Sequence, residues 1–125
     1  MARDLATFFI DETSGVPTIV VDGQIDLTNA DLFKKRMLDV HRMGDPALAV
    51  DLSHCDYIDS SGLSALISVR KRIGAAYPLV VHPDSHIRRL LSITRLDALF
   101  PLYDDRASLH AALLPAEEPT TLASV

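Results

Sequence analysis

The sequence predicts a single α/β domain with a mixed sheet of about four or five strands and helices packed mainly on one face. Its 125 residues suit one folded domain, and 48% hydrophobic with 23% charged residues is ordinary for a chain that buries a core. Two strand-like segments come first, and strand-like and helix-like segments then alternate. This alternation implies parallel strands joined by right-handed crossover helices, which defines the α/β class.

A β-hairpin is expected to open the fold. The segments 5–10 and 17–21 are rich in apolar and β-branched residues, and the polar segment 11–15 between them ends in Gly15. The second strand is expected to end at the segment 22–28, before the first helix.

The first helix is predicted over residues 29–43. Asp26 and Thr28 are suitable N-cap residues for it, and the segment 44–46 contains the Gly and Pro that stop it. Apolar residues recur along it at spacings of three and four: Ala30, Phe33, Met37 and Val40. The helix is therefore amphipathic and packs on one side.

A central strand and a second helix are predicted next. The run 47–52 is short, apolar and partly β-branched, as in a strand that is buried on both faces. The segment 53–58 is expected to connect this strand to a turn at residues 59–62. The helical period that begins there continues through Ile73 and ends at Gly74.

The order of strand and helix then repeats. Residues 79–81 are predicted to form a strand, and residues 83–85 to open a helix that extends to Ile93. Residues 100–103 are the last predicted strand.

A final helix over about residues 106–114 closes the predicted domain, which spans residues 1–114. Residues 115–125 show no hydrophobic period, so a flexible C-terminal tail is expected there.

Charge and cysteine content exclude several classes of protein. The formal net charge of −5 provides no positive field for direct nucleic-acid binding. The single cysteine cannot form an internal disulfide, and the N-terminus does not resemble a signal peptide. No apolar run approaches the roughly 20 residues that a membrane span requires. A cytoplasmic protein without membrane insertion is expected.

Two loops are the candidates for a functional site. In open α/β sheets such sites lie at the carboxyl ends of strands, which points to the segments 23–28 and 56–62. Asp59, Ser60 and Ser61 stand just before a helix, where free N–H groups and the helix dipole favour oxygen atoms and negative charge. A hydroxyl there can cap the helix, which is the commoner role, or accept a phosphate without unfolding the domain.

The stretch DLSHCDYIDSSGLSALISVRKRIG, residues 51–74, resembles the signature of STAS domains and specifically of bacterial anti-sigma factor antagonists. That signature is a strand followed by a D-S-S/T-G-L turn and a helix. Residues 23–26 are similar to the G-E-L-D segment of the family, and residues 85–91 and 96–100 to its S-P-x-V-x-R-x-L and G-L-D-x-x-F blocks. The resemblance covers nearly the whole chain and implies a STAS-type fold.

The resemblance also implies partner switching in a stress response. The unphosphorylated antagonist binds an anti-sigma factor that is also a serine kinase, and so releases a sigma factor that regulates transcription. The kinase then phosphorylates the antagonist, and a phosphatase reverses the modification. Ser60 would be the acceptor, with Ser61 as the second choice, and no catalytic residue, cofactor or metal is implied. The implied partner-binding residues are Asp26, Thr28, Asp59, Ser60, Ser61, Gly62 and Leu63.

Three positions depart from the family pattern. Gln24 replaces Glu, His86 stands where Pro is frequent, and Arg95 stands where Gly is usual. These changes leave the expected fold intact and bear on the partner surface.

Catalysis by Ser60 is a competing hypothesis. It would need His54 or His82 as the base and Asp26 to orient that base. The serine lacks the G-x-S-x-G elbow, and the chain has no Gly-rich oxyanion loop, so the sequence does not favour an enzyme.

Metal and nucleotide sites are also weakly supported. His54, Cys55 and Asp56, or His82 with His86, form no recurring pair of ligands. A nucleotide at the helix N-terminus would lack both common glycine-rich phosphate motifs.

The main alternative keeps the STAS fold but changes the role. The chain could be a scaffold subunit of a stressosome or the STAS subunit of a lipid-transport ATPase complex. A free antagonist is expected to be a monomer or weak dimer, whereas a stressosome subunit assembles into large particles.

Overall fold

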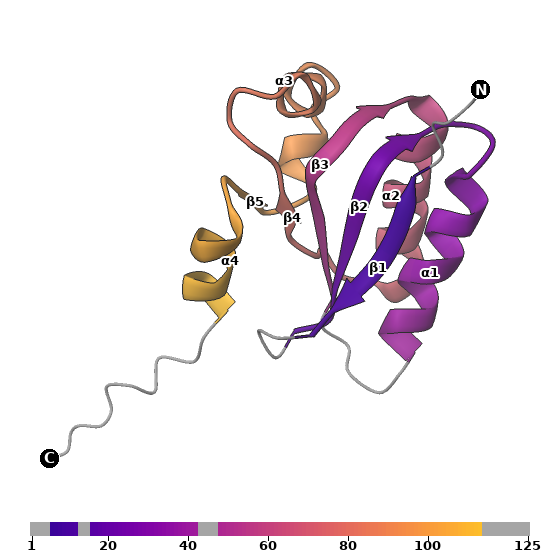
Figure 1. Ribbon diagram of the computed structural model, residues 1–125, viewed down its shortest axis with the longest axis horizontal. Helices are drawn as coiled ribbons and strands as arrows, with labels where there is room; N and C mark the ends of the chain where they lie inside the picture. Colours follow the sequence, from indigo (N-terminus) through magenta and orange to yellow (C-terminus); the bar gives the residue numbers. More distant parts are fainter. Residues whose placement is uncertain (1–5, 13–15, 43–47, 114–125) are drawn as a thin grey trace, which may run out of the picture.

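The computed structural model describes residues 6–12, 16–42 and 48–113 (Figure 1). The expected turn at Gly15, the helix stop at 44–46 and the expected tail at 115–125 lie outside the described residues.

Five strands form one mixed sheet in the order β1-β2-β3-β4-β5. β1 pairs with β2 antiparallel, and every following pair is parallel, which confirms the predicted hairpin and α/β class. The strands are β1 (Thr7–Asp11), β2 (Thr18–Ile25), β3 (Ala49–Ile58), β4 (Leu79–Val80) and β5 (Leu102–Tyr103).

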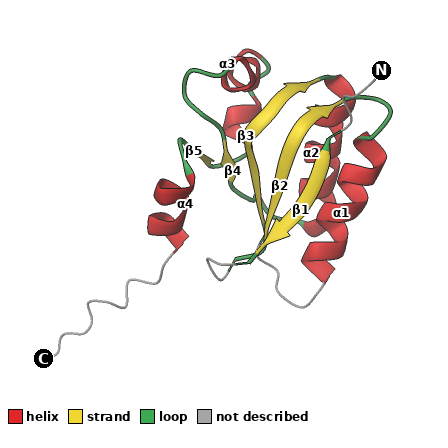
Figure 2. Ribbon diagram, in the orientation of Figure 1, coloured by secondary structure: helices red, strands yellow, loops and turns green. Residues whose placement is uncertain are grey.

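The helices cover the sheet unequally, as Figures 1 and 2 show. Three of them share the large hydrophobic core with the sheet, and α4 packs on a separate small cluster. The helices are α1 (Ala30–Arg42), α2 (Ser60–Ile73), α3 (His86–Ile93) and α4 (Arg106–Leu113), with a 3₁₀ turn at Leu96–Ala98. This arrangement confirms the prediction that helices lie mainly on one face.

Aromatic side chains fix the large core at both ends of the sheet. Phe8 of β1 stacks on Phe33 of α1 with 5.5 Å between ring centroids. Tyr77 packs against Phe100 at 5.0 Å, and its buried hydroxyl donates a hydrogen bond of 2.6 Å to the Leu66 carbonyl. Burial raises the pKa of the Tyr77 hydroxyl well above its ordinary value, so this group remains a neutral donor.

An ion network attaches α4 to the other face of the sheet. Arg106 donates from Nη1 to Asp51 Oδ2 at 3.0 Å and from Nη2 to Asp11 Oδ2 at 2.7 Å. Asp51 is buried in the middle of β3 and also accepts hydrogen bonds from Ser53. Burial disfavours the charged guanidinium, but the two carboxylates outweigh this effect and raise the pKa of Arg106.

The expected connection at 53–58 is wrong, because β3 continues through this segment to Ile58. β2 likewise continues to Ile25 and pairs with it. The register shifts between Val20 and Asp22, and again between Gly23 and Gln24, so that β3 accommodates extra residues as bulges. These bulges break the simple alternation of buried and exposed residues, and for this reason the sequence pattern did not indicate a strand.

Candidate functional site

The candidate site lies where β2 and β3 end side by side. Ile25 and Ile58 are partners in the parallel ladder, and the Asp59 N–H donates to the Ile25 carbonyl at 3.1 Å. The loop after β2 and the first turn of α2 therefore meet at the carboxyl edge of the sheet, as predicted for an open α/β fold.

The loop after β2 is ordered by a carboxylate and an amide. Asp26 Oδ1 accepts hydrogen bonds from the N–H of Thr28 at 2.9 Å and from its hydroxyl at 2.5 Å. Asn29 accepts from the Asp26 N–H and donates to the Gln24 carbonyl, each at 2.9 Å. The hydroxyl and the N–H of Thr28 lower the pKa of Asp26 from its ordinary value.

Asp26 and Thr28 do not cap α1 as expected. Their side chains bond to each other within the turn, and α1 begins later, at Ala30. The Asp26 backbone carbonyl accepts from the N–H groups of Asn29 and Ala30 instead. The two residues thus shape the loop that enters the helix.

Asp59 is the N-cap of α2. Its backbone is extended, and its Oδ1 accepts from the N–H groups of Ser61 at 2.8 Å and Gly62 at 3.1 Å. Ser60 follows as the first helical residue and is exposed. Its hydroxyl has no hydrogen-bond partner within the described part of the chain. Because a carboxylate already caps the helix, the Ser60 hydroxyl is not needed for this structural role.

The next three residues of α2 differ in exposure and surroundings. Ser61 is partly buried and lines a cavity of about 240 Å³ between α1 and α2, together with Lys34. Gly62 is buried, and a Cβ atom there would lie 2.5 Å from Ile58 Cγ1. Leu63 is partly buried and faces a larger groove on the other side.

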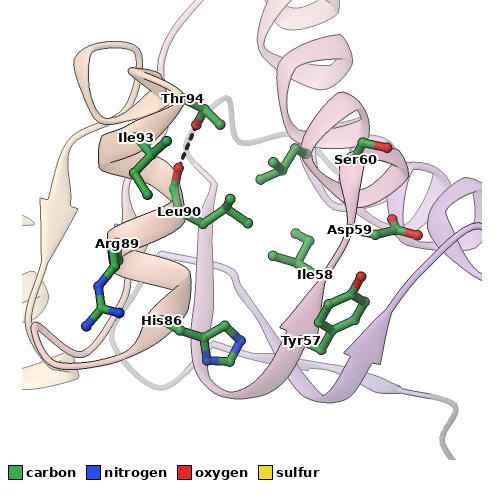
Figure 3. Close-up of a pocket in the computed structure, with 10 residues that line it drawn as sticks. Tyr57, Ile58, Asp59, Ser60, His86, Arg89, Leu90, Ile93 and Thr94 are labelled. Atoms are coloured by element: carbon green, nitrogen blue, oxygen red, sulfur yellow. Dashed lines mark hydrogen bonds between the residues drawn. The ribbon is translucent and has the colours of Figure 1, made fainter.

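This larger groove has a volume of about 620 Å³ and lies between the start of α2, the end of β3 and α3 (Figure 3). We call it the α2–α3 groove. Tyr57 and His86 lie at the lower end of the groove in this view, and Ser60 lies on its border. Its lining residues are Tyr57, Ile58, Asp59, Ser60, Leu63, His86, Arg89, Leu90, Ile93 and Thr94.

Sequence reasoning treated Leu90 and Ile93 as part of one helical period and assigned no site to them. In the structure Ile87 and Leu91 are buried, whereas Leu90 is partly buried and Ile93 is 71% exposed. The sequence does contain a signal for this groove, because the apolar stripe of α3 is wider than the face that the helix buries.

Large apolar side chains are exposed near the carboxyl edge of the sheet. Leu27, in the loop after β2, is 78% exposed, and Tyr57, near the end of β3, is 46% exposed. Tyr57 and Ile93 line the same groove as Ser60, and exposed apolar groups gathered beside polar ones are typical of an interaction surface.

The groups expected for catalysis do not assemble around Ser60. His54 lies on β3 four residues before Ile58, which corresponds to about 13 Å of strand. His82 Nδ1 accepts from the Asp84 N–H at 3.0 Å, and Asp26 is occupied by Thr28. Within the described ranges, no hydrogen bond joins either histidine to the serine.

Cys55 is buried, and burial raises the pKa of its thiol to about 11, so it is no nucleophile at neutral pH. Among the residues that the structure describes, no three His, Cys, Asp or Glu side chains are grouped so that they could hold a metal ion. The same residues include no helix that is long and apolar enough to cross a membrane.

The fold and the site define a class of protein: a small domain with a mixed five-stranded sheet, in which an Asp-capped Ser-Ser-Gly turn opens α2 at the carboxyl edge. The STAS domain family model matches residues 8–109. The chain therefore belongs to the STAS domain family.

Individual relatives agree with this assignment. The anti-sigma-F factor antagonist RsfB of Mycobacterium tuberculosis is 31% identical over 113 residues, which cover 90% of each chain. The crystal structure of an anti-sigma factor antagonist from Mycobacterium paratuberculosis is 30% identical with a TM-score of 0.79, covering 90% of this chain and 97% of that one. The anti-sigma factor antagonist SpoIIAA, at 13% identity, has a TM-score of 0.61 over 85% of this chain and 96% of its own, and shows the fold alone.

Proposed function

We propose that this protein is an anti-sigma factor antagonist whose binding to an anti-sigma factor is controlled by phosphorylation of Ser60. In this function the unphosphorylated chain holds an anti-sigma factor with serine kinase activity, and a sigma factor is released. The kinase transfers a phosphate to Ser60 and dissociates, and a phosphatase restores the free hydroxyl. The names of the two mycobacterial relatives support the general role.

The observation that carries the proposal is that Asp59 and Ser60 have different roles at the start of α2. Asp59 caps α2, and Ser60 is exposed without a hydrogen bond from the described residues. A kinase can therefore reach the Ser60 hydroxyl without breaking a contact that holds the helix. Ser61 is less accessible, because it is partly buried and lines the cavity between α1 and α2.

The charge around Ser60 explains how a phosphate could release a partner. A phosphoserine adds about −1.5 to −2 charges beside the Asp59 carboxylate and near the loop of Asp26. Two unit charges about 4 Å apart interact by roughly 4 kcal/mol at an effective dielectric constant near 20. Reversing a complex from 99:1 bound to 1:99 requires about 5.5 kcal/mol. Local repulsion and lost desolvation at a docked Ser60 can supply most of this difference without a change of fold.

The apolar surroundings of Ser60 supply the affinity that the phosphate opposes. Tyr57 and Ile93 are exposed and line the α2–α3 groove, which Ser60 borders. Because these groups adjoin the acceptor, a protein that covers them also covers Ser60. A phosphate on Ser60 would thus lie within the covered surface and oppose binding.

The test uses the purified kinase-type anti-sigma factor of the source organism with ATP, and mass spectrometry locates the phosphate. Wild type and Ser64→Ala, an exposed serine of the same helix, should gain one phosphate on Ser60. Ser60→Ala should remain unmodified and keep the anti-sigma factor bound. Modification at Ser61, or an anti-sigma factor that binds neither wild type nor Ser60→Ala, would refute the proposal.

A further inference from the structure

We infer that the α2–α3 groove receives an amphipathic helix of the anti-sigma factor, with an acidic residue of that helix beside Arg89. The inference rests on the proposed function, because it states how that partner is held. It assigns binding affinity to residues of α3 that are separate from the phosphate acceptor.

The walls of the groove suit the apolar face of a helix. Leu63 of α2 lines the groove. Leu90 and Ile93 line it from α3 (Figure 3). Ile93 is 71% exposed, although it belongs to a strongly amphipathic helix. An apolar trough between two helical walls is the receptor shape for helix-in-groove recognition, in which anchors at helical spacing enter the trough.

Acidic and basic side chains lie on opposite sides of the groove, and this arrangement would fix the orientation of the bound helix. On the side of the serine Asp59 borders the groove, and on the side of α3 the exposed Arg89 borders it. Arg89 forms no ion pair with any other described residue. A partner helix that is acidic near α3 and basic near Ser60 complements both sides, and such complementarity fixes orientation.

The geometry separates anchoring from switching. In Figure 3 the side chains of Ser60 and Asp59 point away from Leu90 and Ile93, although all four residues border the same groove. A phosphate on Ser60 would therefore leave the apolar trough open. Substitutions in the trough should weaken the complex while the Ser60 hydroxyl stays exposed.

Binding of the purified anti-sigma factor, without ATP, tests the inference by isothermal titration calorimetry. The groove variants are Ile93→Asp and Arg89→Glu, and the matched controls are Ser92→Asp on α3 and Lys71→Glu on α2. All four positions are exposed, and thermal unfolding checks that each variant is folded. We expect Ile93→Asp to raise Kd about 30-fold or more, as for a buried anchor. Arg89→Glu should raise it about 10-fold at low salt, and less at high salt.

Three results would overturn the inference in distinguishable ways. If Ser60→Asp abolishes binding but both groove variants bind as wild type does, the groove proposal fails and the proposed function stands. If wild type does not bind, the proposed function fails and the groove proposal falls with it. A separate NMR titration with dodecanoate, a small amphiphile, covers the remaining case. If the groove variants keep the wild-type Kd for the anti-sigma factor but lose the NMR shifts that dodecanoate produces in wild type, the groove is a site for small amphiphiles.

Discussion

At the scale of single residues, the hydrogen bonds of Thr28 lower the pKa of Asp26. Both the hydroxyl and the N–H of Thr28 donate to the same carboxylate oxygen. They favour the charged form of Asp26 over its protonated form, which lowers the pKa.

Thr28→Val removes the hydroxyl donor while preserving shape, so the pKa of Asp26 should rise toward its ordinary value. In wild type the folded pKa is the lower one, so the stabilisation is present above about pH 4 and is lost as the pH falls through the folded pKa. The variant should lose part of that stabilisation. A carbon-detected NMR titration measures the change, and Asp105, whose pKa is lowered by Ser108, is the internal control. An unshifted Asp26 would contradict the assignment.

Arg95 occupies a backbone conformation that suits glycine. Its φ is 64°, in the left-handed region, and it is the position where the family pattern usually has Gly. A non-glycine residue there costs on the order of 1 kcal/mol.

Arg95→Gly should therefore stabilise the protein by up to about 0.5 kcal/mol, after allowance for the greater freedom of glycine in the unfolded chain. Chemical denaturation measures the free energy of unfolding. The control is Asp97→Gly, at an exposed position without positive φ, which should lower stability. Equal losses in both variants would show that the conformation of Arg95 carries no strain.

At the scale of elements, a close contact sets the position of α2 on the sheet. Gly62 is buried where the helix crosses the ends of β2 and β3, and a Cβ atom would lie within 3.0 Å of Ile58 and Ile25. Both neighbours are core side chains, so neither can move freely.

Gly62→Ala should lower the free energy of unfolding by about 1–3 kcal/mol, although alanine is the better helix former. Urea denaturation measures the loss, and Ser64→Ala on the exposed side of α2 should change stability little. A stable Gly62→Ala variant would mean that α2 can shift outward, and the geometry of the Ser60 turn would then not depend on this contact.

The attachment of α4 depends on Arg106. Arg106→Met leaves the buried carboxylate of Asp51 without its cation, which should cost about 3 kcal/mol. Asp51→Asn combined with Arg106→Met should recover part of that loss, because the uncompensated charge is gone. Denaturation gives the free energies, and hydrogen exchange in α4 locates the effect. Equal stability of the single and double variants would contradict a coupled ion pair.

The elements show which features the sequence could predict. The hairpin, the alternation and the Asp-Ser-Ser-Gly turn follow from local patterns, and the helices occur close to their predicted bounds. The extension of β3 to Ile58 could not be predicted from local patterns. Bulges place two exposed residues in a row there, so the alternation typical of a strand is lost. The pairing of Asp51 with Arg106 joins residues 55 apart in sequence, and no local pattern carries that information.

The candidate site was predictable to a similar degree. The turn of Ser60 and its proximity to the loop of Asp26 follow from strand order, since neighbouring parallel strands end at the same edge. The α2–α3 groove was not predicted, because Leu90 and Ile93 have the same hydrophobic pattern as buried helix residues. Only packing shows that Ile93 is left exposed and that Leu90, although it packs against the core, also lines the groove.

At the scale of the whole molecule, control of binding through Ser60 requires a rigid domain with a surface that changes charge. Ser60 lies outside the core, and its hydroxyl forms no hydrogen bond with the described residues. Phosphorylation should therefore leave the sheet and helices unchanged while altering the partner surface. Amide NMR spectra of the two forms should differ near residues 26–28 and 57–63 and agree elsewhere.

The most direct measurement is the affinity of the anti-sigma factor for the chain with serine and with phosphoserine at position 60. Both forms must first give the same thermal unfolding profile, so that affinity reports the surface alone. We expect the phosphate to raise Kd by several hundredfold to about 10⁴-fold, the range of a complete switch. Equal affinities for the two folded forms would contradict control of binding through Ser60.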